Sequence, residues 1–166
     1  QLTLVSANAK YDRVKMGKEA FTEQEKNGYQ IFKNNCASCH TEPLFSNYNF
    51  ENNGLPLDPT LNDLGRFVIT QNENDKGKFK VPSLRNLSFT YPYMHDGRFM
   101  TLQEVINHYT SGIEYSETLS LQFNKSIELS SNEKVDLISF LLTLNDKDFV
   151  FNKKHQFKKI SDQAKE

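Results

Sequence analysis

The sequence contains no tryptophan, only two cysteines and no long hydrophobic run among its 166 residues. So few cysteines leave no room for a disulfide framework. No apolar stretch approaches the roughly 18 residues of a membrane-spanning helix, and the first residues lack the charged start and apolar centre of a signal peptide. Because the chain opens on Gln1 and not on methionine, we expect it to be a processed or truncated product.

An excess of charge of either sign is also missing. The 20 Lys and Arg residues are matched by 21 Asp and Glu residues, which gives a net charge of −1 at pH 7. This balance offers no general attraction for nucleic acid or an anionic membrane. We therefore expect no nucleic-acid partner and no membrane span.

Apolar side chains are scarce for a chain of this length. Hydrophobic residues make up 37% of the sequence, although a domain of this size should bury roughly 70% of the surface that its unfolded chain exposes. Either much of the chain is irregular, or something other than protein fills part of the core.

Three segments carry the same helix-start signal, a hydroxyl three residues ahead of a carboxylate, which satisfies two free amide groups reciprocally. These pairs are Thr22 with Glu25, Thr101 with Glu104, and Ser130 with Glu133. The first helix is expected over about residues 23–34, the second from residue 101 until Gly112 stops it, and the third over residues 131–144.

The second and third predicted helices each have an apolar face at helical spacing. In the second, the face is formed by Leu102, Val105, Ile106 and Tyr109. In the third, it is formed by Val135, Ile138, Leu141 and Leu142, widened by Leu137 and Leu144. We expect the third helix to pack against the first.

A long segment, about residues 41–100, separates the first two helices. It holds all five prolines and many Asn, Asp and Gly residues, a composition that breaks both helices and strands. An irregular segment of this length in a small domain usually has a functional role, and we expect it to wrap a cofactor. The lysine-rich segment after residue 145 is expected to be a solvated tail.

Both cysteines lie in one pentapeptide, Cys36-Ala37-Ser38-Cys39-His40. This is the attachment pattern of c-type haem. Two thiols three positions apart lie on one side of a helical turn, where they can bond to the two vinyl groups of a porphyrin. The histidine that follows supplies the proximal bond to the iron. The motif predicts one covalently attached haem c held by Cys36 and Cys39, with His40 as iron ligand.

Other uses of the two cysteines fit the sequence less well. A zinc site needs further ligands at short spacing, but His95, His108 and His155 are scattered. A thioredoxin-type redox pair should follow a strand, whereas the residues before Cys36 are predicted to be helical. A disulfide between cysteines so close would close a very small loop and contribute little stability.

A haem also explains the shortage of apolar side chains, because the porphyrin is itself a large apolar disc that a wrapping segment can bury. We therefore predict an all-α, cytochrome c-like domain with long irregular loops around the haem. Attachment of haem c takes place outside the cytoplasm, so we expect a periplasmic or otherwise exported protein.

Two further runs carry a resemblance to a known family: residues 79–87, Phe-Lys-Val-Pro-Ser-Leu-Arg-Asn-Leu, and residues 90–98, Thr-Tyr-Pro-Tyr-Met-His-Asp-Gly-Arg. Over about residues 6–149 the chain resembles the C-terminal, electron-transfer haem domain of bacterial di-haem cytochrome c peroxidases and their MauG-type relatives. In that family one haem domain reacts with hydrogen peroxide, and the other takes electrons from a small donor protein, a cytochrome c or a copper protein.

The resemblance implies a domain organisation and a missing part. Residues 1–20 would be an interdomain arm, residues 21–145 the haem domain and residues 146–166 a C-terminal tail. The peroxide-reacting N-terminal haem domain, with the tryptophan that the family places between its haems, would lie outside this chain. Alternatives are a stand-alone mono-haem cytochrome that shuttles electrons, and a domain whose open iron gives modest peroxidase activity.

The distal iron ligand has two main candidates. Aligned on the His-Asp-Gly motif, Tyr109 falls where peroxidase-type members have a ligating methionine and MauG-type relatives a ligating tyrosine. Met94 competes, because a thioether would raise the potential of an electron-accepting haem. Met100 and His108 are weaker candidates, and Met16 is expected to pack at the surface.

Several residues gain roles from the same resemblance. Lys80 and Arg85 are expected at haem propionates, with Arg66 a weaker candidate. His95 is expected to hold a loop or the haem by a hydrogen bond. The backbone oxygens of Thr90 and Pro92 match positions that help bind an interface calcium ion.

Overall fold

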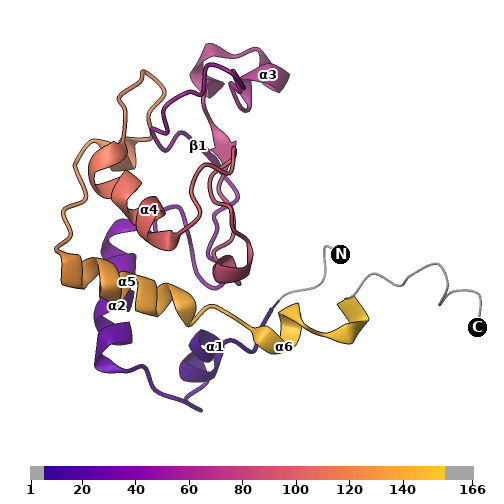
Figure 1. Ribbon diagram of the computed structural model, residues 1–166, viewed down its shortest axis with the longest axis vertical. Coiled ribbons are helices and arrows are strands. Elements are labelled where there is room, and N and C mark those ends of the chain that lie inside the picture. Colours follow the sequence, from indigo (N-terminus) through magenta and orange to yellow (C-terminus); the bar gives the residue numbers. More distant parts are fainter. Residues whose placement is uncertain (1–5, 156–166) are drawn as a thin grey trace, which may run out of the picture.

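The computed structural model describes residues 6–155 and is mostly helical (Figure 1). The α-helices are α1 (Lys10–Lys15), α2 (Glu23–Asn35), α3 (Phe67–Thr70), α4 (Leu102–Asn107), α5 (Ser131–Leu142) and α6 (Lys147–Val150). Shorter helical turns are η1 (Glu73–Asp75), η2 (Leu87–Phe89), the π-helical η3 (His108–Gly112), η4 (Leu121–Phe123) and η5 (Lys153–His155). Two short strands, β1 (Phe50–Glu51) and β2 (Phe79–Lys80), form an antiparallel pair. The expected all-α, cytochrome c-like fold class is confirmed.

The three predicted capping boxes are all present and start α2, α4 and α5. Helix α2 extends one residue beyond the predicted end, and α5 ends at Leu142 and not at residue 144. The predicted second helix is regular only as far as Asn107, after which η3 continues it with π-helical geometry up to Gly112. Such π-turns are frequent at functional sites because they shift the register of the side chains that follow.

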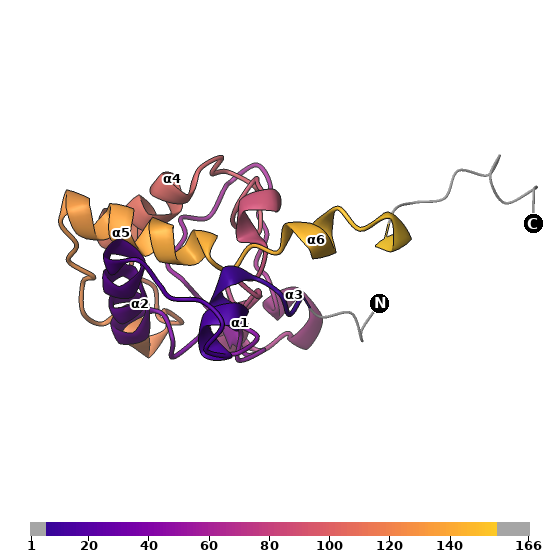
Figure 2. The same ribbon diagram turned by 90° about the horizontal axis from the view of Figure 1, so that it is seen from below.

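Helices α2 and α5 pack against each other, as expected, and cross in both views (Figures 1 and 2). Gly28 makes the crossing close, because a Cβ atom there would lie 1.9 Å from the backbone oxygen of Asp136 on α5. The buried face of α5 matches the predicted face in part. Leu137 and Leu141 are buried as expected, as is Leu144 just beyond the helix, but Phe140 is also buried while Val135 and Leu142 are exposed.

The core beside this crossing is aromatic. Phe32, Phe45 and Phe140 are fully buried, with ring centroids 5.1 Å apart for Phe32 and Phe140 and 5.4 Å apart for Phe32 and Phe45. Tyr11 from α1 packs its ring edge-on at 4.8 Å from Phe45. Edge-to-face contacts of this kind add to the area-based burial energy.

The N-terminal arm packs on this core through its buried residues, among them Tyr11, while residues 15–20 are exposed. The Tyr11 amide donates to the carbonyl of Thr143 at 3.0 Å, and the Ser6 hydroxyl donates to the Asp146 carboxylate at 3.1 Å. Asp146 is buried, and its side chain caps the start of α6 by accepting from the amide of Phe149. The N-terminal arm is thus hydrogen-bonded to Asp146, at the beginning of the predicted tail. The part of the predicted tail after residue 155 lies outside the described residues.

The segment of residues 41–100 runs beside the helices and holds only short elements (Figure 1). Within it, Phe50 pairs with Lys80 and Glu51 with Phe79, and Gly65 bridges to Lys78. Through residues 6–155, no helix combines the length and apolar composition that crossing a membrane requires.

Candidate functional site

The cysteine motif forms a tight turn at the C-terminal end of α2. The amide of Cys36 donates to the Phe32 carbonyl at 2.8 Å, and the amides of Cys39 and His40 donate to the Cys36 carbonyl at 3.2 and 2.9 Å. Both cysteines carry free thiols and are half-buried. Burial, helped by the nearby Cys39, raises the pKa of the Cys36 thiol to about 12, so the motif faces surroundings of low polarity.

The His40 ring is oriented by the backbone. Its Nδ1 lies 3.1 Å from the Phe45 carbonyl and 3.1 Å from the Pro82 carbonyl. Carbonyls only accept, so Nδ1 carries the proton and Nε2 keeps a free lone pair. Burial lowers the pKa of the imidazole, against the opposing effect of the two carbonyls, which favours the neutral, metal-binding form.

A second group of side chains comes from three separate segments. The Asn53 side-chain nitrogen lies 3.3 Å from the Tyr109 hydroxyl and 3.5 Å from the Met94 sulfur. Both candidate distal ligands therefore lie beside one amide group. Asn53 was not among the predicted site residues, because its Asn-Asn-Gly context reads as an ordinary loop.

Tyr109 lies in η3 with its ring between two others. It stacks on Phe123 at 5.6 Å and meets the His108 ring edge-on at 5.1 Å. Burial raises the pKa of the Tyr109 phenol, the Asn53 amide opposes the rise, and the Cys36 and Cys39 thiols add to it. The phenol therefore lies in surroundings of low polarity.

This donor set fits a haem c. Two adjacent thiols can form thioethers, one neutral imidazole has a fixed orientation and a free Nε2, and a phenol and a thioether are available as second axial ligand. Residues 25–145 match the family model for cytochrome c. The chain belongs to the cytochrome c family.

Among curated proteins, this cytochrome c domain is 42% identical over 152 residues to the methylamine utilization protein MauG of Methylophilus methylotrophus, which covers 87% of the chain and 44% of that protein. It is 35% identical over 172 residues to the cytochrome-c peroxidase IdrP2 of Denitromonas iodatirespirans, covering 86% of the chain and 46% of that protein. The chain spans less than half the length of these curated relatives.

A solved structure shares the fold. It is described as a MauG-like protein associated with microbial copper homeostasis and matches with a TM-score of 0.80 at 31% identity, over 90% of this chain and 55% of that chain. The predicted relationship to the di-haem cytochrome c peroxidase and MauG group is thus confirmed.

The weaker candidates for the distal ligand are engaged elsewhere in the cytochrome c domain or are exposed. His108 is buried, and its Nε2 donates to the Asn53 carbonyl at 3.0 Å, which occupies the nitrogen that would bind a metal. Met100 and Met16 are 57% and 59% exposed. Tyr109 and Met94 remain as the two candidates.

Arg85 forms an ion pair within the protein. Its guanidinium is nearly buried against the Asp12 carboxylate, with contacts of 2.9 and 2.8 Å, and its Nε donates to the Pro43 carbonyl at 2.9 Å. These contacts use three of the five N–H donors of the guanidinium, so a propionate role for Arg85 stays a prediction. Sequence reasoning missed Asp12, which lies 73 residues away.

The other predicted basic residues are less constrained. Lys80 is exposed and holds its ammonium group 5.0 Å above the Tyr48 ring, so a propionate role for Lys80 stays a prediction. Arg66 lies over the Phe50 ring at 4.2 Å and contacts Asp75 at 3.3 Å.

His95 stacks on Phe79, and its expected hydrogen bond to a loop or the haem stays a prediction. Its ring lies 3.7 Å from the Phe79 ring with an angle of 21° between the planes. Its side chain makes no hydrogen bond within residues 6–155, and it is exposed.

The predicted calcium positions lie around η2 and the turn that follows it. Thr90 and Pro92 are both exposed, and no hydrogen bond from residues 6–155 ends on either backbone oxygen. The described residues also contain no cluster of three His, Cys, Asp or Glu side chains able to hold a metal. Calcium binding here stays a prediction.

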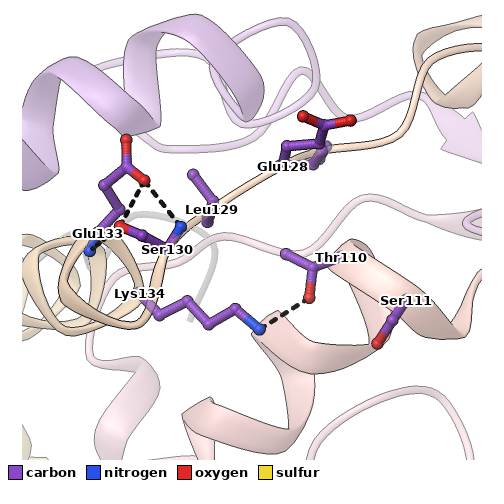
Figure 3. A pocket seen from close by; sticks show the side chains of 8 residues that line it. Thr110, Ser111, Glu128, Leu129, Ser130, Glu133 and Lys134 are labelled. Carbon is purple, nitrogen blue, oxygen red and sulfur yellow. Dashed lines mark hydrogen bonds between the residues drawn. The ribbon is translucent and has the colours of Figure 1, made fainter.

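An open hollow of about 560 Å³ lies between η3 and the start of α5 (Figure 3). Lys134 reaches across it to the Thr110 hydroxyl at 3.1 Å, and Glu133 accepts from Ser130. None of the predicted site residues lines this hollow, and its Lys134 and Glu133 are already paired. We assign no function to it.

Proposed function

We propose that the chain is the C-terminal, electron-transfer haem domain of a di-haem cytochrome c peroxidase or MauG-like oxidase, and that it receives electrons from a small cytochrome c or copper protein. The observation that carries this proposal is the turn Cys36-Ala37-Ser38-Cys39-His40, in which two backbone carbonyls orient the His40 ring. A haem bound there would supply an iron that gains and loses single electrons.

The residues of the chain have distinct roles in this proposal. Cys36 and Cys39 attach the porphyrin, and His40 binds the iron through Nε2. The carbonyls of Phe45 and Pro82 fix the ring and increase its basicity, which strengthens the bond to the metal. In this proposal the reaction with hydrogen peroxide belongs to the N-terminal haem domain of a longer protein.

We propose Tyr109 as the distal ligand, with Met94 as the alternative. An anionic tyrosinate stabilises ferric iron and lowers the potential, whereas a thioether favours the ferrous state. Tyr109 is supported by its environment, since it is in the π-helical turn η3 and its hydroxyl lies 3.3 Å from the Asn53 side-chain nitrogen.

The test has two parts. The chain is exported into the periplasm of a bacterial host that matures c-type cytochromes, and covalently bound haem is measured after denaturation. We expect one haem per chain, and none after replacement of both Cys36 and Cys39 by alanine. The ferric spectra of Tyr109→Phe and Met94→Leu are then compared. A changed low-spin spectrum in Tyr109→Phe alone supports Tyr109, and a change in Met94→Leu alone assigns the site to Met94.

A stand-alone mono-haem cytochrome is the second candidate, and the packing of the arm favours it, because Tyr11 belongs to the same core as the helices and Ser6 donates to Asp146. The coding region before Gln1 separates the two. A second Cys-x-x-Cys-His motif there supports the di-haem proposal, and an initiator methionine with only an export signal supports the mono-haem one.

We also propose that Thr90 and Pro92 contribute backbone oxygens to a calcium site at the interface with the other haem domain. Two backbone oxygens alone make an incomplete calcium site. Calcium should therefore raise the unfolding temperature of the longer protein but leave that of residues 1–166 unchanged.

A further inference from the structure

Both oxygen atoms of Asn53 accept hydrogen bonds from the protein, while its side-chain nitrogen donates to the two candidate ligands. Its backbone carbonyl accepts from His108 Nε2 at 3.0 Å, and its side-chain oxygen accepts from the Leu55 amide at 3.4 Å. The two hydrogens on its side-chain nitrogen are directed at the Tyr109 oxygen and the Met94 sulfur.

The residues on either side of Asn53 hold this loop firmly. Asn52 is buried, and its side chain donates to the hydroxyls of Ser116 and Thr118 at 3.0 and 2.9 Å. Gly54 has a left-handed backbone, and its carbonyl accepts from the Glu114 amide at 2.8 Å. The loop that carries Asn53 is therefore held by hydrogen bonds to residues 114–118, which follow η3.

We propose that Asn53 is a positioning residue that donates a hydrogen bond to the iron-bound oxygen of Tyr109 and thereby raises the reduction potential of the haem. This inference rests on the proposed function, with Tyr109 as distal ligand. A hydrogen bond to an anionic ligand withdraws electron density from it, so the ligand stabilises ferric iron less. The thioether of Met94 is a weaker acceptor and takes the second hydrogen.

The hydrogen bond from Asn53 also influences whether Tyr109 or Met94 binds the iron. An amide pointing at both side chains stabilises phenolate more than thioether, because hydrogen bonds to charged acceptors are about twice as strong as neutral ones. Asn53 thus favours Tyr109 over Met94 at the iron, while moderating how strongly that ligand holds the iron in the ferric state.

The test measures the reduction potential and the ferric spectrum of holoprotein carrying Asn53→Leu. Loss of a hydrogen bond to a charged group should change the ferric to ferrous ratio about tenfold in favour of ferric, and for a one-electron couple a tenfold change is 59 mV. The control is Gln30→Leu, which removes an exposed side-chain amide that donates to the Asn34 side chain at 2.9 Å and does not contact Tyr109. Its potential should be unchanged.

A double-variant cycle shows whether Asn53 acts through Tyr109. The shift caused by Asn53→Leu should vanish in a Tyr109→Phe background. A shift of the same size in both backgrounds, or no shift in the native background, overturns the inference. If Tyr109→Phe has a native spectrum, the ligand assignment of the proposed function fails, which is a different result.

Two further measurements test the hydrogen bond from Asn53 if Asn53→Leu does not fold. Asn53→Asp keeps the shape of the side chain, removes the donors and adds a negative charge, so its potential should shift in the same direction and further. On the native holoprotein, exchange into D2O should shift the iron–tyrosinate stretching frequency in the resonance Raman spectrum. An unshifted frequency overturns the hydrogen bond.

Discussion

Arg85 and Asp12 form a two-pronged ion pair, with Nη1 2.9 Å from Oδ2 and Nη2 2.8 Å from Oδ1. The pair joins helix α1 to the segment that runs beside the core, and its side chains are only 8% and 10% exposed. Planar two-point contacts of this kind are geometrically specific as well as strong. The relationship is structural and joins residues far apart in the sequence.

Removing one partner of this pair should destabilise the protein strongly. Arg85→Leu leaves the Asp12 carboxylate buried and unpaired, which should cost about 3 kcal/mol in the free energy of unfolding, measured with urea. Lys26→Leu is the control, since its pair with Glu23 is exposed and should contribute less than about 0.5 kcal/mol. Equal effects of the two substitutions would contradict the structural role of Arg85.

The close crossing of α2 and α5 should not tolerate a larger residue at position 28. Gly28→Ala would force its methyl group against the Asp136 carbonyl and should cost about 2–3 kcal/mol of unfolding free energy. The neighbouring exposed Asn27 on the same helix gives the control, because Asn27→Ala should be neutral or slightly stabilising through helix propensity. A stabilised Gly28→Ala protein would show that the helices are further apart.

Gly54 and Gly17 form a matched pair for testing the loop that carries Asn53. Both have left-handed backbones, with φ values of 68° and 72°, but a Cβ at position 54 would lie 2.5 Å from the Ile113 side chain while one at position 17 meets nothing within 4 Å. Gly17→Ala should cost about 1 kcal/mol from the backbone alone, and Gly54→Ala about 3 kcal/mol with the added overlap. Thermal unfolding of both variants measures the difference.

The Asp146 carboxylate should make stability depend on acid pH. Its burial raises its pKa, but hydrogen bonds from Phe149, Asn8 and Ser6 outweigh this and lower the pKa overall. The folded protein therefore binds the proton less readily than the unfolded chain, so the stabilisation is complete above about pH 4, the usual unfolded pKa, and is lost as the pH falls through the folded value.

Asp146→Asn should accordingly reduce the free energy of unfolding at pH 7 by about 1–2 kcal/mol. The difference from the native protein should shrink as the pH is lowered below about 4, and urea unfolding across this range measures it. The exposed Asp148 provides the control, because Asp148→Asn should have little effect at either pH. A difference that is constant with pH would rule out the carboxylate as the source.

The helix starts were predictable because each capping box is written within four residues and needs no distant partner, as at Thr22, Thr101 and Ser130. The haem motif was predictable for the same reason, since Cys36, Cys39 and His40 lie within five residues. The function of such local patterns is independent of how the rest of the chain packs.

Features that depend on residues far apart in the sequence could not be predicted from such local patterns. The partner of Arg85 lies 73 residues away, and Asn53 meets Tyr109 from a loop 56 residues earlier. The apolar spacing in α5 predicted the helix and the burial of Leu137 and Leu141, but it missed Phe140, because the exact face depends on where α2 packs. The π-helical turn at His108 likewise has no local signature in the sequence.

Phe45 belongs to two parts of the molecule at once. Its ring is fully buried in the aromatic core against Tyr11 and Phe32, while its carbonyl oxygen holds Nδ1 of His40. A loosening of the core must therefore tilt the imidazole. With haem attached, the visible absorption spectrum should therefore report on the packing of the core. We expect core substitutions far from the iron to change this spectrum at temperatures below those at which the helices unfold.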